Sequence, residues 1–203
     1  MADYAHPEVL ADTQWVADHL NDPKVRILEV GINPTAYNEA HIPGALYWNA
    51  VGTGLHADFR SNLEKSAVEA LCSRSGIDND TTVVAYGEFI AFGAWVYWYL
   101  KMFGHREVRV LNGSRKKWRD EGRPVSTEAP TVAVATYVAQ APDFTARASL
   151  TDVRAAVGAP GKVLIDTRRP EEYAGNGSGP SRPRTTNAPV TSRVQRTSTT
   201  KMR

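Results

Sequence analysis

Residues 39–45 of this 203-residue chain read Glu-Ala-His-Ile-Pro-Gly-Ala, and the prediction of the fold starts from them. They stand between two short segments rich in aliphatic and aromatic residues, 25–30 and 45–48, which have the composition of buried strands. His41 is next to a turn, where a histidine more often hydrogen-bonds a backbone carbonyl than binds a metal. The stretch therefore connects two predicted strands.

On both sides of this stretch, apolar runs alternate with helical patterns. Helices are predicted at residues 13–20, 65–75, 91–102 and 114–121, and further strands at 82–86 and 108–111. Thr13 is expected to cap the first helix, and Gly76 is expected to close the second. Strands that alternate with helices are typical of the α/β class, here with a mostly parallel sheet flanked by helices.

A domain boundary is expected where this pattern weakens. Residues 125–147 contain Pro and Ala with one extended piece, 132–138, which suits an interdomain linker. The first domain is therefore predicted at residues 1–124. A second, incomplete domain is predicted at residues 148–174.

The second domain begins as the first one does. A helix at 149–157, capped by Ser149, is followed by a strand at 163–166. Residues 27–30 read Ile-Leu-Glu-Val and residues 164–167 read Leu-Ile-Asp-Thr, each with a tyrosine further on. Two similar units therefore begin in this chain, and only one is completed.

Residues 39–45 resemble the GHIPGA signature near the start of rhodanese domains. The shared positions include His41, Pro43 and Gly44, and the stretch follows the first predicted strand, as the signature does in that family. The resemblance implies a rhodanese-like domain at the N-terminus.

Two further segments extend the resemblance. Gly113 and Trp118 belong to a segment similar to GG-x-x-x-W, which follows a late strand in rhodanese domains. Asp166, Arg168 and Tyr173 lie in a segment similar to D-x-R-x-x-x-E-[YF], which opens a second copy. The chain thus resembles a two-domain thiosulfate or 3-mercaptopyruvate sulfurtransferase that is truncated or frameshifted within its second copy.

The resemblance implies a specific chemistry. Members of this family move a sulfane sulfur from a small-molecule donor to a thiophilic acceptor through a cysteine persulfide. The cysteine lies in a C-R-x-G-x-R type loop of the C-terminal copy. Inward-facing N–H groups at a helix N-terminus stabilise the thiolate and receive the anionic donor.

The completed copy lacks a cysteine at the matching place. Gly87 occupies the nucleophile's position after the strand at 82–86, and Glu88 puts negative charge where an anionic donor needs positive potential. The first domain is therefore predicted to be non-catalytic, and no catalytic residue is assigned in this chain.

The remaining residue types point to no other chemistry. Cys72, the only cysteine, falls on an apolar helical stripe and is predicted to be a core residue. The five histidines have no metal-ligand spacing, so neither a metal nor a cofactor is expected. The basic run 115–117 is interpreted as a solvated helix face that can also attract anions. Neither G-x-S-x-G nor a P-loop occurs.

Residues 175–203 differ from the rest of the chain. They carry six basic and no acidic residues, whereas residues 1–174 carry 18 basic and 22 acidic ones. This basic segment has almost no aliphatic residues and is predicted to be disordered. It has no aromatic residue on which a base could stack, so no nucleic-acid binding is expected. Regrouping the possible codons of residues 189–195 two bases along permits Gly-His-Ile-Pro-Gly-Ala, which motivates the hypothesis of a frameshift near residue 175.

Composition bounds the remaining possibilities. The chain is 42% hydrophobic, has no apolar run long enough to cross a bilayer, and shows no signal-peptide pattern, so a folded cytoplasmic protein without membrane contact is expected. Two hypotheses stay open. The chain is either an inactive or misread form of a sulfurtransferase, or a catalytically silent rhodanese-like module that binds or regulates a partner.

Overall fold

The structure, a computed structural model, describes residues 4–58, 60–87, 89–168 and 170–174. It separates into two compact units, Met1–Phe144 and Thr145–Arg203. Each unit is described by itself. The predicted disorder of residues 175–203 lies outside the described residues.

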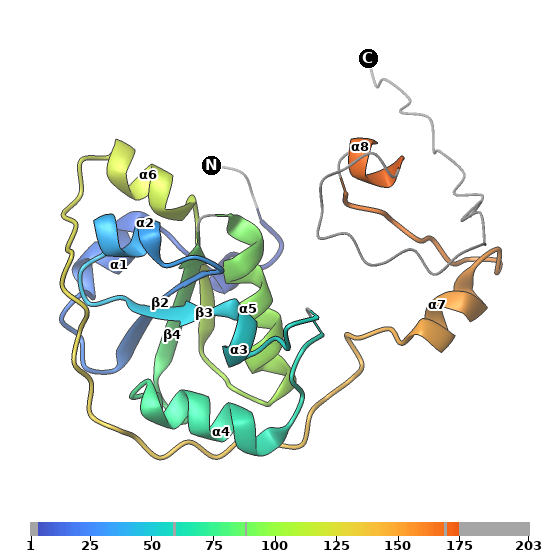
Figure 1. The fold of residues 1–203 in the computed structure, drawn as a ribbon, viewed down its shortest axis with the longest axis horizontal. Coiled ribbons are helices and arrows are strands. Elements are labelled where there is room, and N and C mark those ends of the chain that lie inside the picture. Colours follow the sequence, from blue (N-terminus) through green and yellow to red (C-terminus); the bar gives the residue numbers. More distant parts are fainter. Residues whose placement is uncertain (1–3, 59, 88, 169, 175–203) are drawn as a thin grey trace. The chain divides into compact units, whose positions relative to one another are not determined.

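A five-stranded parallel sheet forms the centre of the first unit (Figure 1). Its order is β1-β5-β4-β2-β3, and all pairings between neighbouring strands are parallel. The strands are β1 (Leu10–Ala11), β2 (Val25–Gly31), β3 (Leu46–Asn49), β4 (Thr82–Gly87) and β5 (Val108–Leu111). The predicted α/β class is confirmed.

Helices cover both faces of this sheet (Figure 1). The helical segments are η1 (Pro7–Val9), α1 (Thr13–Asp18), α2 (Thr35–Glu39), α3 (Ala50–Thr53), α4 (Lys65–Arg74), α5 (Ile90–Met102) and α6 (Ser114–Asp120). One hydrophobic core lies between the sheet and helices α4 and α5, and a second lies between the sheet and helices α1 and α6.

The two cores receive different side chains of β2 because successive residues of a strand point to opposite faces. Leu28 and Val30 belong to the core under α4 and α5, whereas Ile27 belongs to the core under α1 and α6. Glu29 shares the face of Ile27 and is only 3% exposed. The alternation therefore places a carboxylate next to an apolar core.

Helix α1 is capped by a different residue from the one predicted. Its N-cap is Asp12, whose carboxylate accepts a hydrogen bond from the backbone N–H of Trp15 at 2.7 Å. Thr13 is already helical and buried, and its hydroxyl donates instead to the carboxylate of Glu121. The Thr13 side chain thus links helix α1 to the residue that follows helix α6.

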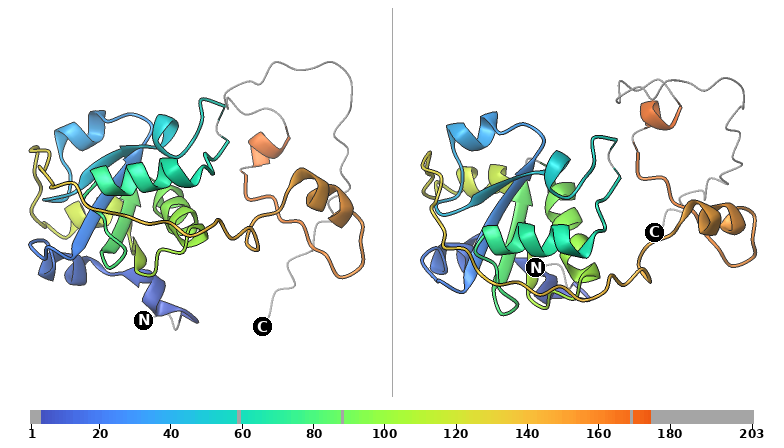
Figure 2. Two further views of the ribbon diagram at one scale, coloured as in Figure 1. Left: turned by 90° about the horizontal axis from the view of Figure 1, so that it is seen from below. Right: turned by 60° about the horizontal axis from the view of Figure 1, so that its bottom comes forward.

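Residues 125–144, called the strap below, run along the outside of the first unit in extended form (Figure 2). The N–H of Ala135 donates to Ser73 of α4 at 2.9 Å, and the N–H of Gln140 donates to Phe103 at 3.0 Å. Tyr137 is 3% exposed within the first core. The strap is therefore part of the first unit.

His41 fastens the beginning of the strap. Its backbone exchanges two hydrogen bonds of 2.9 Å with Ser126. The ring is fully buried, with Nδ1 2.8 Å from the carbonyl oxygen of Tyr37 and Nε2 3.0 Å from that of Glu128. The expected bond between His41 and a backbone carbonyl is present.

This packing shifts the first domain from the predicted residues 1–124. The predicted linker, 125–147, is attached to the first unit over most of its length, and the unit ends at Phe144. Composition favoured a linker because residues 125–147 contain Pro and Ala and the helix and strand patterns weaken there. The attachment of the strap depends on scattered hydrogen bonds to backbone and side-chain groups of the first unit and on the burial of Tyr137.

The second unit contains two short helices, α7 (Leu150–Ala156) and α8 (Pro170–Tyr173). Ser149 caps α7 as predicted, in a reciprocal pair of hydrogen bonds with Asp152. The strand predicted at residues 163–166 does not form, and Val163 is 81% exposed. A strand needs a neighbour for its backbone groups, and none is present among the described residues of this unit.

The described part of the chain contains no helix that is both long enough and apolar enough to cross a membrane.

Shortening the chain tests the role of the strap. A chain of residues 1–144 should melt at the same temperature as the first unit does in the full chain. A chain of residues 1–124 should melt about 10 °C lower, because it exposes the core around Tyr137 at a cost of about 3 kcal/mol. Thermal unfolding followed by circular dichroism measures both. Equal melting temperatures for the two shortened chains would show that the strap contributes nothing.

Candidate functional site

The carboxyl ends of parallel strands are where open α/β sheets bind ligands. In this sheet, the central strand β4 ends at Gly87, and its neighbours β2 and β5 end at Gly31 and Leu111. The loop that follows β4 leads into helix α5, so it occupies the middle of this edge. This loop is the place that the family resemblance assigns to the nucleophile.

Gly87 has no room for a side chain. A Cβ built on it would lie 2.8 Å from the Cβ of Phe92 and even closer to the carbonyl oxygen of Val30. Contacts this short to a backbone atom require the strand or the helix to move. The loop is thus built around a glycine, and a cysteine at this position would not fit without rearrangement. Glu88 lies outside the described residues.

The start of helix α5 presents apolar side chains instead of an anion-binding cradle. Phe89 is 62% exposed and Ile90 is 60% exposed. Phe89 is the N-cap residue and forms no side-chain cap hydrogen bond. The described part of this loop therefore offers no cationic side chain to an anionic sulfur donor.

A buried ion pair lies on the face of the sheet that is covered by α6. Nη1 of Arg115 is 2.7 Å from Oε1 of Glu29, and the side chains are only 13% and 4% exposed. Burial raises the pKa of the Tyr86 hydroxyl well above its ordinary value, and the negative charge of Glu29 raises it further. Tyr86 therefore stays a neutral phenol, and its oxygen accepts the N–H of Ile42 at 3.1 Å.

The signature residues of the first unit shape its turns and core. Gly44 adopts a φ of +77°, in the left-handed region that glycine tolerates best. Trp118 is fully buried, and its indole N–H donates to the carbonyl oxygen of Pro124 at 2.7 Å. Gly113 precedes α6 as its N-cap residue. With His41, these residues have structural roles.

The signature residues of the second unit form a local cluster. The guanidinium of Arg168 is within 3.0 Å of both carboxylate oxygens of Asp166, and it lies 5.9 Å from the ring centre of Tyr173. Hydrogen bonds from Arg168 lower the pKa of Asp166 to about 2. Asp166 therefore keeps its negative charge over the ordinary pH range.

Cys72 lies in the first core, as predicted. Its side chain is fully buried in α4, and burial raises the pKa of the thiol to about 12. The nucleophilic form of a cysteine is the thiolate, which is almost absent at neutral pH when the pKa is this high. Cys72 therefore has neither the charge state nor the access that a sulfur-carrying nucleophile needs.

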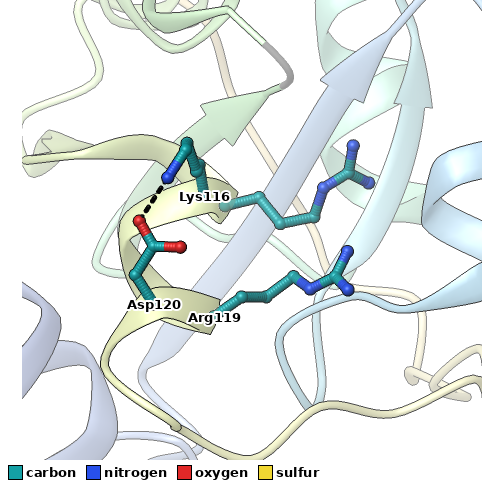
Figure 3. Close-up of a pocket in the computed structure, with 4 residues that line it drawn as sticks. Lys116, Arg119 and Asp120 are labelled. Atoms are coloured by element: carbon teal, nitrogen blue, oxygen red, sulfur yellow. Dashed lines mark hydrogen bonds and ion pairs between the residues drawn. The ribbon is translucent and has the colours of Figure 1, made fainter.

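A cavity of about 430 Å³ opens beside helix α6 (Figure 3). Its lining consists of Arg115, Lys116, Arg119 and Asp120. The sequence indicated that the run 115–117 could attract anions, but it did not single out Arg119. Glu29 was also missed as a charged site residue, although a lone glutamate inside an aliphatic strand pattern was the available signal.

No group of three or more His, Cys, Asp or Glu side chains is placed to hold a metal ion among the residues that the structure describes.

The sheet order and the two helical layers define the first unit as a domain of the rhodanese fold class. The family described as "Rhodanese-like domain" matches residues 12–121, and the chain belongs to that family. It is 41% identical to a sulfur carrier protein of Thermus thermophilus over 183 residues, which cover 85% of this chain and 62% of that protein. It is 42% identical to a protein of Saccharopolyspora erythraea, provisionally named thiosulfate sulfurtransferase, with 83% of this chain and 59% of that protein covered.

Solved structures agree on the fold. The crystal structure of SseA from Escherichia coli, described as a 3-mercaptopyruvate sulfotransferase, matches with a TM-score of 0.66 at 22% identity, covering 81% of this chain and 67% of that chain. An anaerobic ergothioneine biosynthesis enzyme from Chlorobium limicola matches with a TM-score of 0.75 at 21% identity, covering 88% and 48%. The chain spans about three fifths of the length of the curated relatives named above.

The buried ion pair makes a measurable prediction about stability. Arg115→Met should lower the free energy of unfolding by about 3 kcal/mol, because it leaves the carboxylate of Glu29 buried beside an apolar side chain. Adding Glu29→Gln to that variant should restore part of the loss. Urea unfolding measures each value.

The matched control is Lys116→Met, which removes the exposed ion pair with Asp120 and should cost less than about 1 kcal/mol. If Arg115→Met proved no more costly than this control, the buried pair would have no structural role.

Proposed function

We propose that the chain is the N-terminal, non-catalytic part of a two-domain sulfurtransferase that uses thiosulfate or 3-mercaptopyruvate as its sulfur donor. The proposal is supported by the relatives, whose names include a sulfur carrier protein and thiosulfate sulfurtransferases. In this proposal, residues 148–174 begin the second, catalytic copy. A small donor and a thiophilic acceptor are the partners, and neither nucleic acid nor a membrane takes part. A cytoplasmic location belongs to the same proposal and rests on the sequence alone.

The observation that carries the proposal is the packing around Gly87. The position that holds the nucleophile in the catalytic copy is filled here by a residue whose Cβ would collide with Val30 and Phe92. The only cysteine of the chain is buried in α4, with the pKa of its thiol raised to about 12. Neither position supplies an accessible thiolate, so the chain itself is inactive.

The proposed reaction explains why an accessible thiolate is indispensable. The thiolate attacks the outer sulfur of thiosulfate, the sulfur–sulfur bond breaks, and sulfite leaves with the bonding electron pair. The persulfide then gives its outer sulfur to the acceptor, and the thiolate is regenerated. With cyanide as acceptor, the product is thiocyanate. In both steps sulfur is transferred to or from one cysteine, which no other residue type of this chain can replace.

A catalytically silent binding module is the second candidate. It is favoured by the exposed pair Phe89 and Ile90, which presents apolar side chains at the start of α5, at the edge of the sheet. In this alternative, residues 1–144 bind or regulate a partner through that surface. Failure of these residues to capture any one partner reproducibly would count against it.

Turnover measurements test the first proposal. The purified 203-residue chain should form no thiocyanate from thiosulfate and cyanide above the uncatalysed rate, and Cys72→Ser should behave identically. The physical reason is that Cys72 is inaccessible and protonated. Turnover by the chain that Cys72→Ser abolishes would overturn the assignment of Cys72 as a core residue.

A further inference from the structure

Helix α6 holds four cations in seven residues, and one of them pairs with no acidic side chain among the described residues. Arg115 pairs with Glu29 at 2.7 Å, Lys116 with Asp120 at 2.5 Å, and Lys117 with Glu121 at 3.8 Å. The side chain of Arg119 makes no hydrogen bond or ion pair with any residue that the structure describes. Within the described part of the chain, Arg119 is therefore the cation of α6 whose charge no acidic side chain neutralises.

Arg119 lines the α6 cavity together with Arg115 and Lys116 (Figure 3). In this view its side chain extends away from Asp120, which is engaged with Lys116. The cavity volume of about 430 Å³ lies within the range of small-molecule sites. Three cations and one carboxylate of α6 thus line this cavity.

Arg115 and Arg119 are four residues apart, a spacing that places side chains on the same face of a helix. Two like charges at this spacing destabilise a helix, and a bound anion would reverse that effect. The two arginines also differ in mobility. The ion pair with buried Glu29 fixes Arg115, whereas Arg119 is exposed and can close onto a ligand.

The chemistry of the guanidinium group selects the ligand. Each guanidinium presents five N–H donors in a planar fork that matches two oxygens of a carboxylate or a tetrahedral oxyanion. A pair with one carboxylate cannot occupy all five donors, so Arg115 can bind an anion and keep its bond to Glu29. Asp120 is the group that opposes such binding, because its negative charge lies on the same wall of the cavity.

We propose that Arg115, Lys116 and Arg119 form a binding site for a doubly charged tetrahedral oxyanion, such as thiosulfate, sulfate or phosphate, either free or as the head group of an ester. The site lies beside α6, on the face of the sheet opposite α4 and α5. It needs no cysteine and does not depend on the proposed sulfur transfer.

Titration of the full chain with each anion at low ionic strength tests the proposal. Isothermal titration calorimetry with sodium thiosulfate, sodium phosphate and glycerol phosphate should show saturable binding of one anion per chain. Arg119→Gln should weaken binding about tenfold, because it removes a charge-assisted contact. Asp120→Asn should strengthen binding about twofold, because it removes a repulsive charge and releases Lys116.

The matched control is Arg106→Gln, which makes the same substitution before β5, at the strand end opposite α6. Arg106 is exposed and paired only at the surface with Asp80, so both the fold and anion binding should be unchanged. Arg115 is left intact in these experiments because its loss is expected to destabilise the fold through the buried pair with Glu29.

The outcomes separate the two sources of the anion. Equal affinity for phosphate and glycerol phosphate supports a site for the free anion, and tighter binding of glycerol phosphate assigns the site to an ester. Absence of saturable binding, or binding that Arg119→Gln and Arg106→Gln weaken equally, would overturn the proposal.

Discussion

The close approach of helix α5 to the end of strand β4 constrains everything at the functional edge of this domain. Gly87 lies against the carbonyl oxygen of Val30 and the Cβ of Phe92, so the loop can form only around a residue without a side chain. Gly93, further along α5, is also confined, since a Cβ there would lie 2.8 Å from the carbonyl oxygen of Ala85. Helix and strand therefore pack backbone to backbone at the place where a catalytic copy needs space for a thiolate and its donor.

The buried ion pair of the first unit lies on the α6 side of the sheet. Glu29 and Arg115 form this pair. The charge of Glu29 helps to raise the pKa of the Tyr86 hydroxyl, and this neutral hydroxyl accepts a hydrogen bond from the N–H of Ile42. The same arginine lines the α6 cavity, so a structural ion pair also fixes one wall of the proposed anion site. The loop after β4, in contrast, exposes Phe89 and Ile90. The proposed anion site and the nucleophile position, which the resemblance places together in a catalytic loop, are thus separate in this domain.

The sequence predicted the elements that have a strong pattern and missed those that depend on single contacts. The strands at 25–30, 45–48, 82–86 and 108–111 were found because they are rich in aliphatic and aromatic residues, whereas β1 is too short for any pattern. The strap was predicted to be a linker because its sequence has no helix or strand period. It is attached instead by single contacts, such as the hydrogen bond of Ala135 and the burial of Tyr137. The lining of the α6 cavity was predicted only in part. The basic run 115–117 stands out in the sequence, but Arg119 is singled out only by the ion pairs of its neighbours, which the sequence does not show.

Intact-protein mass spectrometry after incubation of the full chain with thiosulfate or 3-mercaptopyruvate, without an acceptor, tests most directly whether this chain can carry sulfur. Because Gly87 offers no thiol and the thiol of Cys72 is buried with its pKa raised to about 12, the mass should remain that of the unmodified chain. A stable gain of one sulfur atom that disappears when cyanide is added would contradict the account, because it would show that this chain forms a transferable persulfide.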